Sequence, residues 1–209
     1  MTEQEMSTRE QLLNLLKMKG PSSVGELAGQ LQITEMAVRR HINTLERDGL
    51  IESKRVRQAM GRPTQMYYLS QAADDLFPKG YHKLVLDLLE ELDTEDNELV
   101  TKLFQQRMRK LERTHEQRMD TKSFHEKVEE LAFIQKESGY MAELEQISAD
   151  SYLLHEYNCP ISKVAQRYEQ ACRCELELFK TLLGTEQVER TECLAKGGGK
   201  CTYSIKQST

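Results

Sequence analysis

All five cysteines of the chain lie in its last quarter. The first 158 of the 209 residues contain none, and the thiols follow at Cys159, Cys172, Cys174, Cys193 and Cys201. Thiolates bind soft metal ions and react with oxidants, whereas structural disulfides belong to oxidising compartments. Because five is an odd number, the pattern indicates metal binding or redox sensing ahead of a disulfide framework. Inert buried thiols are the alternative.

The composition indicates the kind of compartment in which these thiols lie. Charged residues make up 30% of the chain and hydrophobic residues 38%, which is typical of a globular, helix-rich protein. No apolar run approaches the roughly 18 residues of a membrane span, and the first residues lack the apolar stretch of a signal peptide. We therefore expect a cytoplasmic protein without membrane contact, whose cysteines stay reduced.

The elements that carry the cysteines form an α+β pattern after Gly139. We expect strands over residues 140–147 and 152–157, a helix from Pro160 to Gly184, and a hairpin of residues 188–194 and 200–205. Cys159 precedes the helix, where the N–H groups of the helix end favour a thiolate. Cys193 and Cys201 become cross-strand neighbours if the turn occupies residues 195–199.

The helix raises a difficulty of distance. In an unbroken helix Cys172 lies about 20 Å from Cys159, which is too far for one metal to bind both. Either the helix breaks, most simply near residues 168–171, or the two thiols belong to different sites or subunits. Cys172 and Cys174 point to different faces of the helix, so only one of them easily shares a site with Cys159.

The first third of the chain has the pattern of three helices and a hairpin. One helix covers residues 8–17, the next begins with a capping box at Ser23, and a third runs from Thr34 to Gly49. Val38, Ile42 and Leu45 form the inward stripe of the third helix. Two strands then bracket a Gly- and Pro-containing turn at residues 58–64.

The outer face of this third helix and the hairpin have the chemistry of a DNA contact. Arg pairs with guanine and Asn with adenine, and basic hairpin residues reach phosphates. Residues 1–72 hold ten basic and eight acidic side chains, although the whole chain has a net charge of −5. A solvated helix face is the alternative. The candidate DNA-binding residues are Thr34, Glu35, Met36, Arg39, Arg40, Asn43, Lys54, Arg55, Arg57 and Arg62.

Two segments of this region carry a resemblance. The sequences ELAGQLQITEMAVRRHINTLERDGLI and GRPTQMYYLS resemble winged-helix bacterial transcriptional regulators. This resemblance implies a winged helix-turn-helix DNA-binding domain over residues 1–72, with a double-stranded DNA operator as its partner.

The middle of the chain, residues 73–138, is expected to be a helical connector and dimerisation region. A charged helix over residues 95–119 carries a narrow apolar stripe, which suits packing against a second subunit or within the chain. Reading a two-fold operator favours a homodimer. The stripe consists of Leu99, Val100, Leu103, Phe104, Met108 and Leu111.

Both ends of the chain resemble SufR-type iron–sulfur transcriptional repressors. The motifs are Asn158-Cys159-Pro160-Ile161, the gap to Cys172, Val188-Glu189-Arg190 and Gly199-Lys200-Cys201. The family pattern C-x12-C-x13-C-x14-C holds a [4Fe–4S] cluster, and Cys159, Cys172 and Cys201 match its first, second and fourth positions. The resemblance also implies that Cys159 and Cys172 approach each other.

The third position of that pattern departs from the family. It falls on Glu186, and a position that is cysteine in other members, four residues before Cys159, is His155 here. Because thiolates are the usual ligands of iron–sulfur clusters, we favour Cys193 as the fourth ligand. Cys174, His155 and Glu186 remain the alternatives.

The sequence therefore predicts a mainly α protein with α+β parts: a winged helix-turn-helix, the helical connector, and a cysteine-rich α+β sensor domain over residues 139–209. The expected function is a DNA-binding regulator, in the first instance a repressor, whose operator affinity depends on an iron–sulfur cluster. The alternative is the same regulator with zinc or redox-active thiols. A thiol-dependent enzyme is the remote reading, because phosphate-loop, nucleophile-elbow and hydrolase motifs are missing from the sequence, and no small-molecule substrate is expected.

Overall fold

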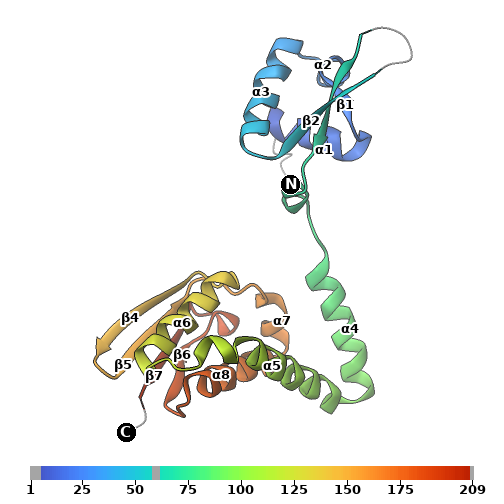
Figure 1. The fold of residues 1–209 in the computed structure, drawn as a ribbon. Coiled ribbons are helices and arrows are strands. Elements are labelled where there is room, and N and C mark those ends of the chain that lie inside the picture. Colours follow the sequence, from blue (N-terminus) through green and yellow to red (C-terminus); the bar gives the residue numbers. More distant parts are fainter. Residues whose placement is uncertain (1–5, 58–61, 208–209) are drawn as a thin grey trace. The chain divides into compact units, whose positions relative to one another are not determined.

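The computed structural model describes residues 6–57 and 62–207 of the chain (Figure 1). They form two compact units, Met1–Lys79 and Gly80–Thr209, each with a hydrophobic core of its own. The expected combination of a helix-turn-helix part and mixed α+β parts is confirmed.

The helices of the first unit begin at the caps that the sequence predicts. The hydroxyl of Ser23 accepts a hydrogen bond from the backbone of Glu26, whose carboxylate accepts one in return from the Ser23 backbone. Thr34 caps the third helix by accepting a hydrogen bond from the Ala37 N–H, at 3.2 Å. These caps satisfy backbone groups that a helix start leaves unpaired. The helices are α1 (Thr8–Lys19), α2 (Val24–Leu31) and α3 (Glu35–Arg47).

A small antiparallel sheet completes this unit. Its strand order is β1-β3-β2, and β2 and β3 form the predicted hairpin. The expected turn at residues 58–64 lies partly outside the described residues, since 58–61 are not described. The elements are β1 (Ser22–Ser23), β2 (Ile51–Val56), β3 (Thr64–Leu69) and the short helix η1 (Ala72–Leu76).

The core of the first unit fixes which face of α3 points outward. Val38, Ile42 and Leu45 are fully buried against α1 and α2, as their spacing predicts. Leu12 and Leu27 are buried in the same cluster. The opposite face of α3 is therefore left to solvent.

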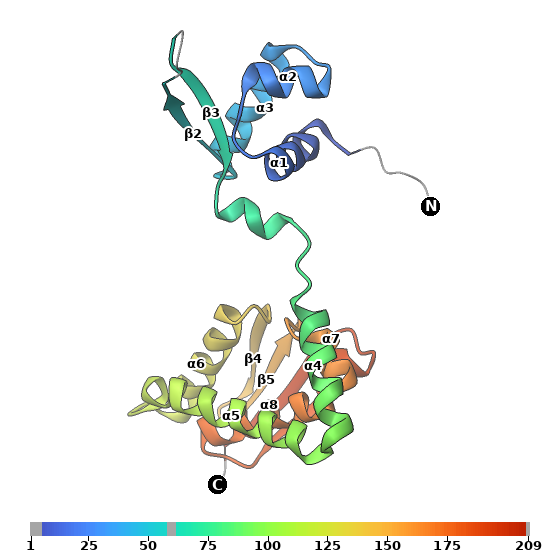
Figure 2. The same ribbon diagram turned by 90° about the vertical axis from the view of Figure 1, so that its right-hand side faces the viewer.

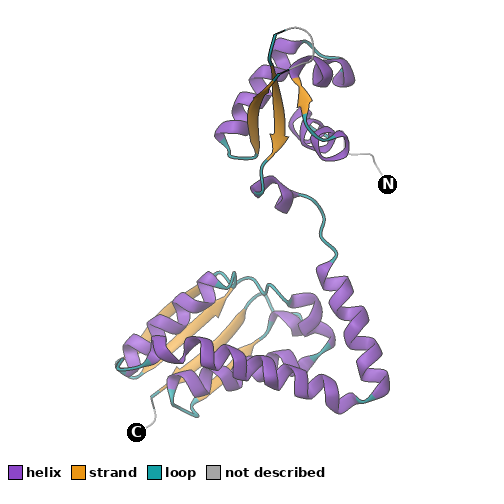
Figure 3. Ribbon diagram, turned by 45° about the vertical axis from the view of Figure 1, so that its right-hand side comes forward, coloured by secondary structure: helices purple, strands orange, loops and turns teal. Residues whose placement is uncertain are grey.

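The second unit is a helical layer on one face of a four-stranded antiparallel sheet. The sheet order is β4-β5-β7-β6, and Figures 1 and 3 show α5, α6 and α8 packed on it. In the view of Figure 2 the strands lie behind these helices. The elements are α4 (Tyr81–Glu95), α5 (Asn97–Met119), α6 (Phe124–Glu137), β4 (Ala142–Ser148), β5 (Ser151–Glu156), α7 (Ser162–Arg167), α8 (Glu169–Leu183), β6 (Val188–Glu192), η2 (Leu194–Lys196) and β7 (Cys201–Lys206).

The helix after Pro160 is interrupted, as the resemblance implies. Tyr168 takes an extended conformation with φ −121° and ψ 93°, and it separates α7 from α8. Its side chain is buried, and its ring centroid lies 6.4 Å from that of Phe104 on α5. Because of this break, the distance between Cys159 and Cys172 in a straight helix does not apply.

The helical segment at residues 73–138 differs from the separate connector that we expected. Val100 and Phe104 of α5 and Leu131 of α6 are buried in the same core as Tyr203 and Ile205 of the sheet. Much of the α5 stripe therefore packs within the chain. The start of this segment, η1, instead belongs to the first unit, where Ala73 is fully buried.

Candidate functional sites

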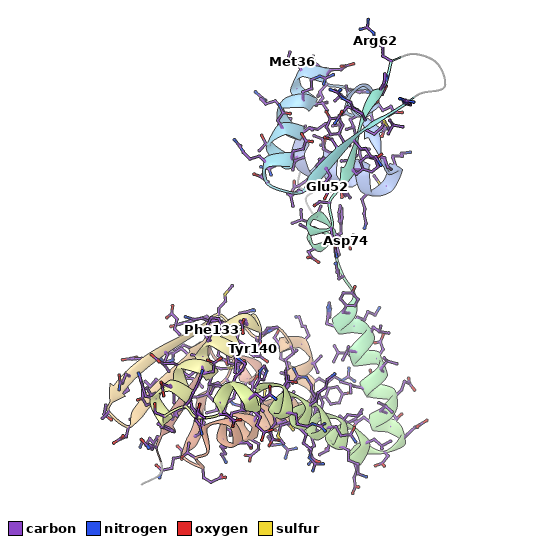
Figure 4. All side chains as sticks on the ribbon, viewed as in Figure 1. Met36, Glu52, Arg62, Asp74, Phe133 and Tyr140 are labelled. Carbon is purple, nitrogen blue, oxygen red and sulfur yellow. The ribbon has the colours of Figure 1, made fainter. Side chains whose placement is uncertain are left out.

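The outward face of α3 presents the candidate base-reading side chains. Met36, Arg39, Arg40 and Asn43 are exposed, with Met36 77% exposed. Figure 4 shows Met36 projecting from the start of α3. Arg39 lies 3.5 Å from Glu35 one turn earlier, and such an exposed pair is weak enough to open for a nucleic-acid contact. The exposed N-terminal part of such a helix is what helix-turn-helix proteins insert into the major groove.

The hairpin adds cations beside this helix. Lys54 and Arg55 of β2, Arg57 just after it, and Arg62 before β3 are all exposed. Arg62 is labelled in Figure 4. In the register of the hairpin Arg55 faces Gln65, which carries no charge. In the described part of the chain no carboxylate forms an ion pair with any of the four. Their charges are therefore available to phosphates.

In the second unit, three cysteines from separate parts of the chain interact with a fourth, Cys193. Cys159 lies between β5 and α7, Cys172 in α8, Cys193 after β6, and Cys201 at the start of β7. Cys193 is the common neighbour: it shares a side-chain hydrogen bond with Cys172 and interacts electrostatically with Cys159 and Cys201. We call this group the thiol pocket.

A β-bulge sets the position of Cys193. Arg190 pairs with Tyr203, but Glu192 pairs with Thr202, so the register shifts by one residue at Thr191. Continued by one step, the shifted register sets Cys193 opposite Cys201. Without the bulge, Glu192 would lie opposite Cys201. The expected pairing of Cys193 with Cys201 therefore depends on the extra residue that the bulge inserts.

Burial raises the pKa of three of the pocket thiols, Cys159, Cys172 and Cys201. It raises the pKa of Cys159 to about 11, although a hydrogen bond from the Ile161 backbone acts in the opposite direction. Burial likewise raises the pKa of Cys172 and of Cys201 to about 12. The expectation of a thiolate at Cys159 is therefore wrong for this state, because desolvation outweighs the helix-end effect.

Arg190 is a cation at the edge of the pocket. The half-buried guanidinium of Arg190 donates a hydrogen bond from Nη1 to the Cys172 carbonyl, at 2.9 Å. It lies 5.9 Å from the ring centroid of Tyr203, whose hydroxyl donates to Glu175 at 2.8 Å. The charge of Arg190 lowers the pKa of Cys172 and so favours a thiolate there.

A buried carboxylate that the sequence reasoning missed also adjoins the pocket. Glu156, the last residue of β5, is 0% exposed. Neither of its carboxylate oxygens has a hydrogen-bond partner among the described residues. In β5 it alternates with Tyr152 and Leu154 on the buried face, a signal that the apolar Leu153 of the other face obscures in the sequence.

The three alternative ligands lie elsewhere. Cys174 interacts with Arg173, Arg107 and Glu177 and not with the pocket thiols. Glu186 is exposed and lies 3.3 Å from Lys180.

His155 is the third of these alternatives. It pairs with Thr202 in the ladder, one residue out of step with the Glu156–Cys201 pair, so it belongs to the opposite face of the sheet. There its Nδ1 is 3.1 Å from the Thr202 hydroxyl. Cys193 is thus the fourth-ligand candidate that the fold places beside the other three.

The donor set of the pocket fits a metal centre in its chemistry. Four thiols suit an iron–sulfur cluster or zinc. The buried carboxylate of Glu156 lacks a hydrogen-bond partner among the described residues, and a bound cation would offset the cost of burying it. In the metal-free arrangement, no three His, Cys, Asp or Glu side chains of the described residues converge closely enough to hold a single ion.

A family comparison agrees with the geometry of the first unit. The model of the HTH domain family (HTH_11) matches residues 8–61. The first unit is a helix-turn-helix domain. With the hairpin after α3, it makes the chain a DNA-binding transcription regulator of the winged-helix kind, with DNA as its partner.

Solved structures give more limited similarities. Lactococcus lactis ZitR, in the apo C30AH42A mutant, is 26% identical over 47% of this chain and 76% of that chain, with a TM-score of 0.32. A structure described as a zinc-responsive MarR family member, also L. lactis ZitR, is 22% identical over 45% and 78%, with a TM-score of 0.30. Streptococcus pyogenes adhesin competence repressor AdcR is 19% identical over 48% and 75%, with a TM-score of 0.32.

The remaining comparisons add little. No curated protein matches the chain. The comparisons confirm the helix-turn-helix domain and do not confirm the resemblance to SufR-type repressors. Within residues 6–57 and 62–207, no helix is both long and apolar enough to cross a membrane.

Proposed function

We propose that this regulator binds its operator with an affinity set by a metal centre in the thiol pocket, held by Cys159, Cys172, Cys193 and Cys201. The observation that carries the proposal is the gathering of four thiols from four elements around Cys193. An effector shifts DNA affinity only if it interacts differently with the DNA-binding conformations of the protein. A centre that ties four elements together has that property.

An iron–sulfur cluster is our first candidate for the centre. Such clusters are held by cysteine thiolates, and the four pocket cysteines supply the usual number. When bound, a cluster makes the site responsive to oxidants and to iron supply. The protein's part is to release four thiol protons, to which Arg190 contributes at Cys172 by favouring the thiolate.

Zinc is the alternative centre. Four thiolates also suit a tetrahedral zinc site, with each sulfur about 2.3 Å from the ion. Metal analysis distinguishes the two centres by their iron and zinc content. A visible absorption spectrum does so as well, since an iron–sulfur protein absorbs visible light and a zinc protein does not.

We also propose a homodimer, formed through α4. None of the described α4 side chains is buried, and Tyr81, Leu84, Val85 and Leu88 are 70%, 58%, 42% and 57% exposed. These residues are spaced as one stripe along the helix, and contiguous exposed apolar surface is typical of an interaction site. A second copy of the chain is the partner that a two-fold operator requires.

The α4 stripe is continuous with a hollow whose lining includes the residues that directly follow Cys159. A hollow of about 480 Å³ between α4, α5 and α7 is lined by Val85, Leu103, Ile161 and Val164, among others. Ile161 follows Cys159 by two residues, and its backbone interacts with that thiol. A centre bound at Cys159 therefore fixes one wall of the hollow, which gives metal binding a route to the proposed subunit contact.

The test is DNA binding by the same protein with and without its metal. The protein is purified anaerobically, its iron, sulfide and zinc are measured, and operator fragments are selected from a random DNA library. Loaded and metal-free samples should differ at least fivefold in affinity for the selected sequence. Equal affinities would leave the cysteines a structural role only, and absence of metal would remove the centre itself.

A further inference from the structure

Among the residues that the structure describes, Glu156 is the buried group at the thiol pocket whose side-chain oxygens have no hydrogen-bond partner. It is 0% exposed, and both carboxylate oxygens lack a hydrogen-bond partner in the described part of the chain. A buried polar group without a partner is costly, and an unpaired charge costs more. Burial accordingly raises the pKa of Glu156 to about 9.

The strand register directs this carboxyl to the same face as one of the thiols. Glu156 and Cys201 are partners in the β5–β7 ladder, so their side chains leave the sheet on one side. Glu156 also interacts electrostatically with Cys159 and Cys193. The carboxyl is therefore a ladder neighbour of Cys201 and lies within electrostatic range of Cys159 and Cys193.

The nearby polar groups are already engaged with other partners. Glu175 accepts the hydrogen bond of the Tyr203 hydroxyl, at 2.8 Å. Arg190 donates to the Cys172 carbonyl, and its charge only partly offsets the burial of Glu156. A purely structural carboxyl in this position would be expected to hold one of these groups.

We propose that Glu156 is a fifth donor of the pocket, a carboxylate ligand for a metal atom of the centre. The inference rests on the proposed function, which it extends by one ligand. Carboxylate oxygen is a harder donor than thiolate and binds both zinc and iron. Because four thiolates already complete a tetrahedral zinc site or give one ligand to each iron of a cluster, this carboxylate would raise the coordination number of one metal atom from four to five.

The experiment compares Glu156→Gln, Glu156→Asp and the wild-type full chain. Glu156→Gln keeps the shape and removes the anionic donor, and Glu156→Asp keeps a carboxylate on a shorter side chain. Two probes are used: zinc in competition with a chromophoric chelator, and ferrous iron with sulfide under anaerobic reconstitution. The matched control is Glu143→Gln, an exposed carboxyl on the neighbouring strand β4.

We expect Glu156→Gln to bind the metal at least tenfold more weakly, with a changed absorption spectrum, and Glu156→Asp to recover part of the loss. The metal-free Glu156→Gln protein should unfold at the same or a higher denaturant concentration than wild type, because the unpaired acid is gone. A merely structural glutamate would give the reverse, a destabilised metal-free protein. Wild-type metal binding with unchanged binding by Glu156→Gln overturns this inference alone, whereas a wild type that takes up neither probe overturns the proposed function as well.

Discussion

The backbone N–H of Leu194 donates a hydrogen bond to the Sγ of Cys201, at 3.4 Å. The turn that leads from β6 to β7 thus folds over the thiol at the start of β7. The same turn is closed at its other end by the Gly198 N–H, which donates to the Cys193 carbonyl at 3.0 Å. Two of the four pocket cysteines are therefore held by one short turn.

The pocket predicts an uneven response to cysteine replacement. Cys159→Ser, Cys172→Ser, Cys193→Ser and Cys201→Ser should each lower the bound metal to less than half, since each removes a thiolate from the proposed centre. Cys174→Ser should retain nearly all of it, because Cys174 interacts electrostatically with Arg107 and Glu177 and not with the pocket thiols. Metal content after anaerobic purification measures this. Full metal content in the Cys193→Ser protein would show that another residue is the fourth ligand.

Gly198 is predicted to be necessary for the turn. A Cβ at this position would lie 2.9 Å from the Cys193 carbonyl oxygen and 2.9 Å from Cγ of Glu192, closer than such contacts allow. Gly198→Ala should therefore destabilise the second unit by about 1–3 kcal/mol and weaken metal binding. Gly199→Ala is the matched control, because its Cβ would meet only Glu192 Oε1, at an ordinary 3.7 Å. Chemical unfolding and zinc titration of both variants check it, and equal behaviour of the two would contradict the close approach.

The exposed cations of the first unit should divide into two kinds. Arg39→Ala and Arg40→Ala should each cost about 1–3 kcal/mol of operator binding and relax base preference, as expected for base contacts. Arg62→Ala should weaken all sequences alike and reduce the salt slope by about one, as expected for a phosphate contact. Arg113→Ala, an exposed residue of α5, is the control. Gel-shift titrations over a range of salt concentrations measure these effects, and unaltered binding by all three variants would rule out this docking surface.

The proposed dimer is tested on α4. Leu84→Glu combined with Leu88→Glu places charge in the apolar stripe, which is costly in a buried interface. Sedimentation should then show monomers at micromolar concentration, with the α-helical circular dichroism unchanged because neither side chain is buried in the chain. Ile147→Glu, an equally exposed apolar position on β4, should leave the dimer intact. A dimeric Leu84/Leu88 double variant would exclude α4 as the interface.

The sequence predicted the first unit nearly to its ends because caps and spacing agree there. Ser23, Thr34 and the left-handed Gly49 mark helix boundaries by local hydrogen bonding and backbone conformation. The apolar stripe of α5 was found as well, but not its partner. A narrow apolar stripe has the same sequence pattern whether it packs against a second subunit or against α8 of the same chain.

The pocket was harder to predict because its geometry depends on two irregularities. The bulge at Thr191 sets Cys193 against Cys201, and no residue type at that position requires a bulge. Glu156 was missed since both faces of β5 carry apolar residues. Tyr152 and Leu154 alternate with Leu153 and Tyr157, so the pattern alone does not tell which face is buried.

The break at Tyr168 bears on the order in which the pocket comes apart. Cys172, Cys193 and Cys201 are buried, with 7%, 9% and 6% exposure, and belong to α8 and the β6–β7 hairpin. Cys159 lies on the far side of the break and is only partly buried. Cys159 is thus the pocket thiol most accessible from solvent. We therefore expect an oxidant to react there first, so that loss of the proposed centre begins at the thiol beside α7.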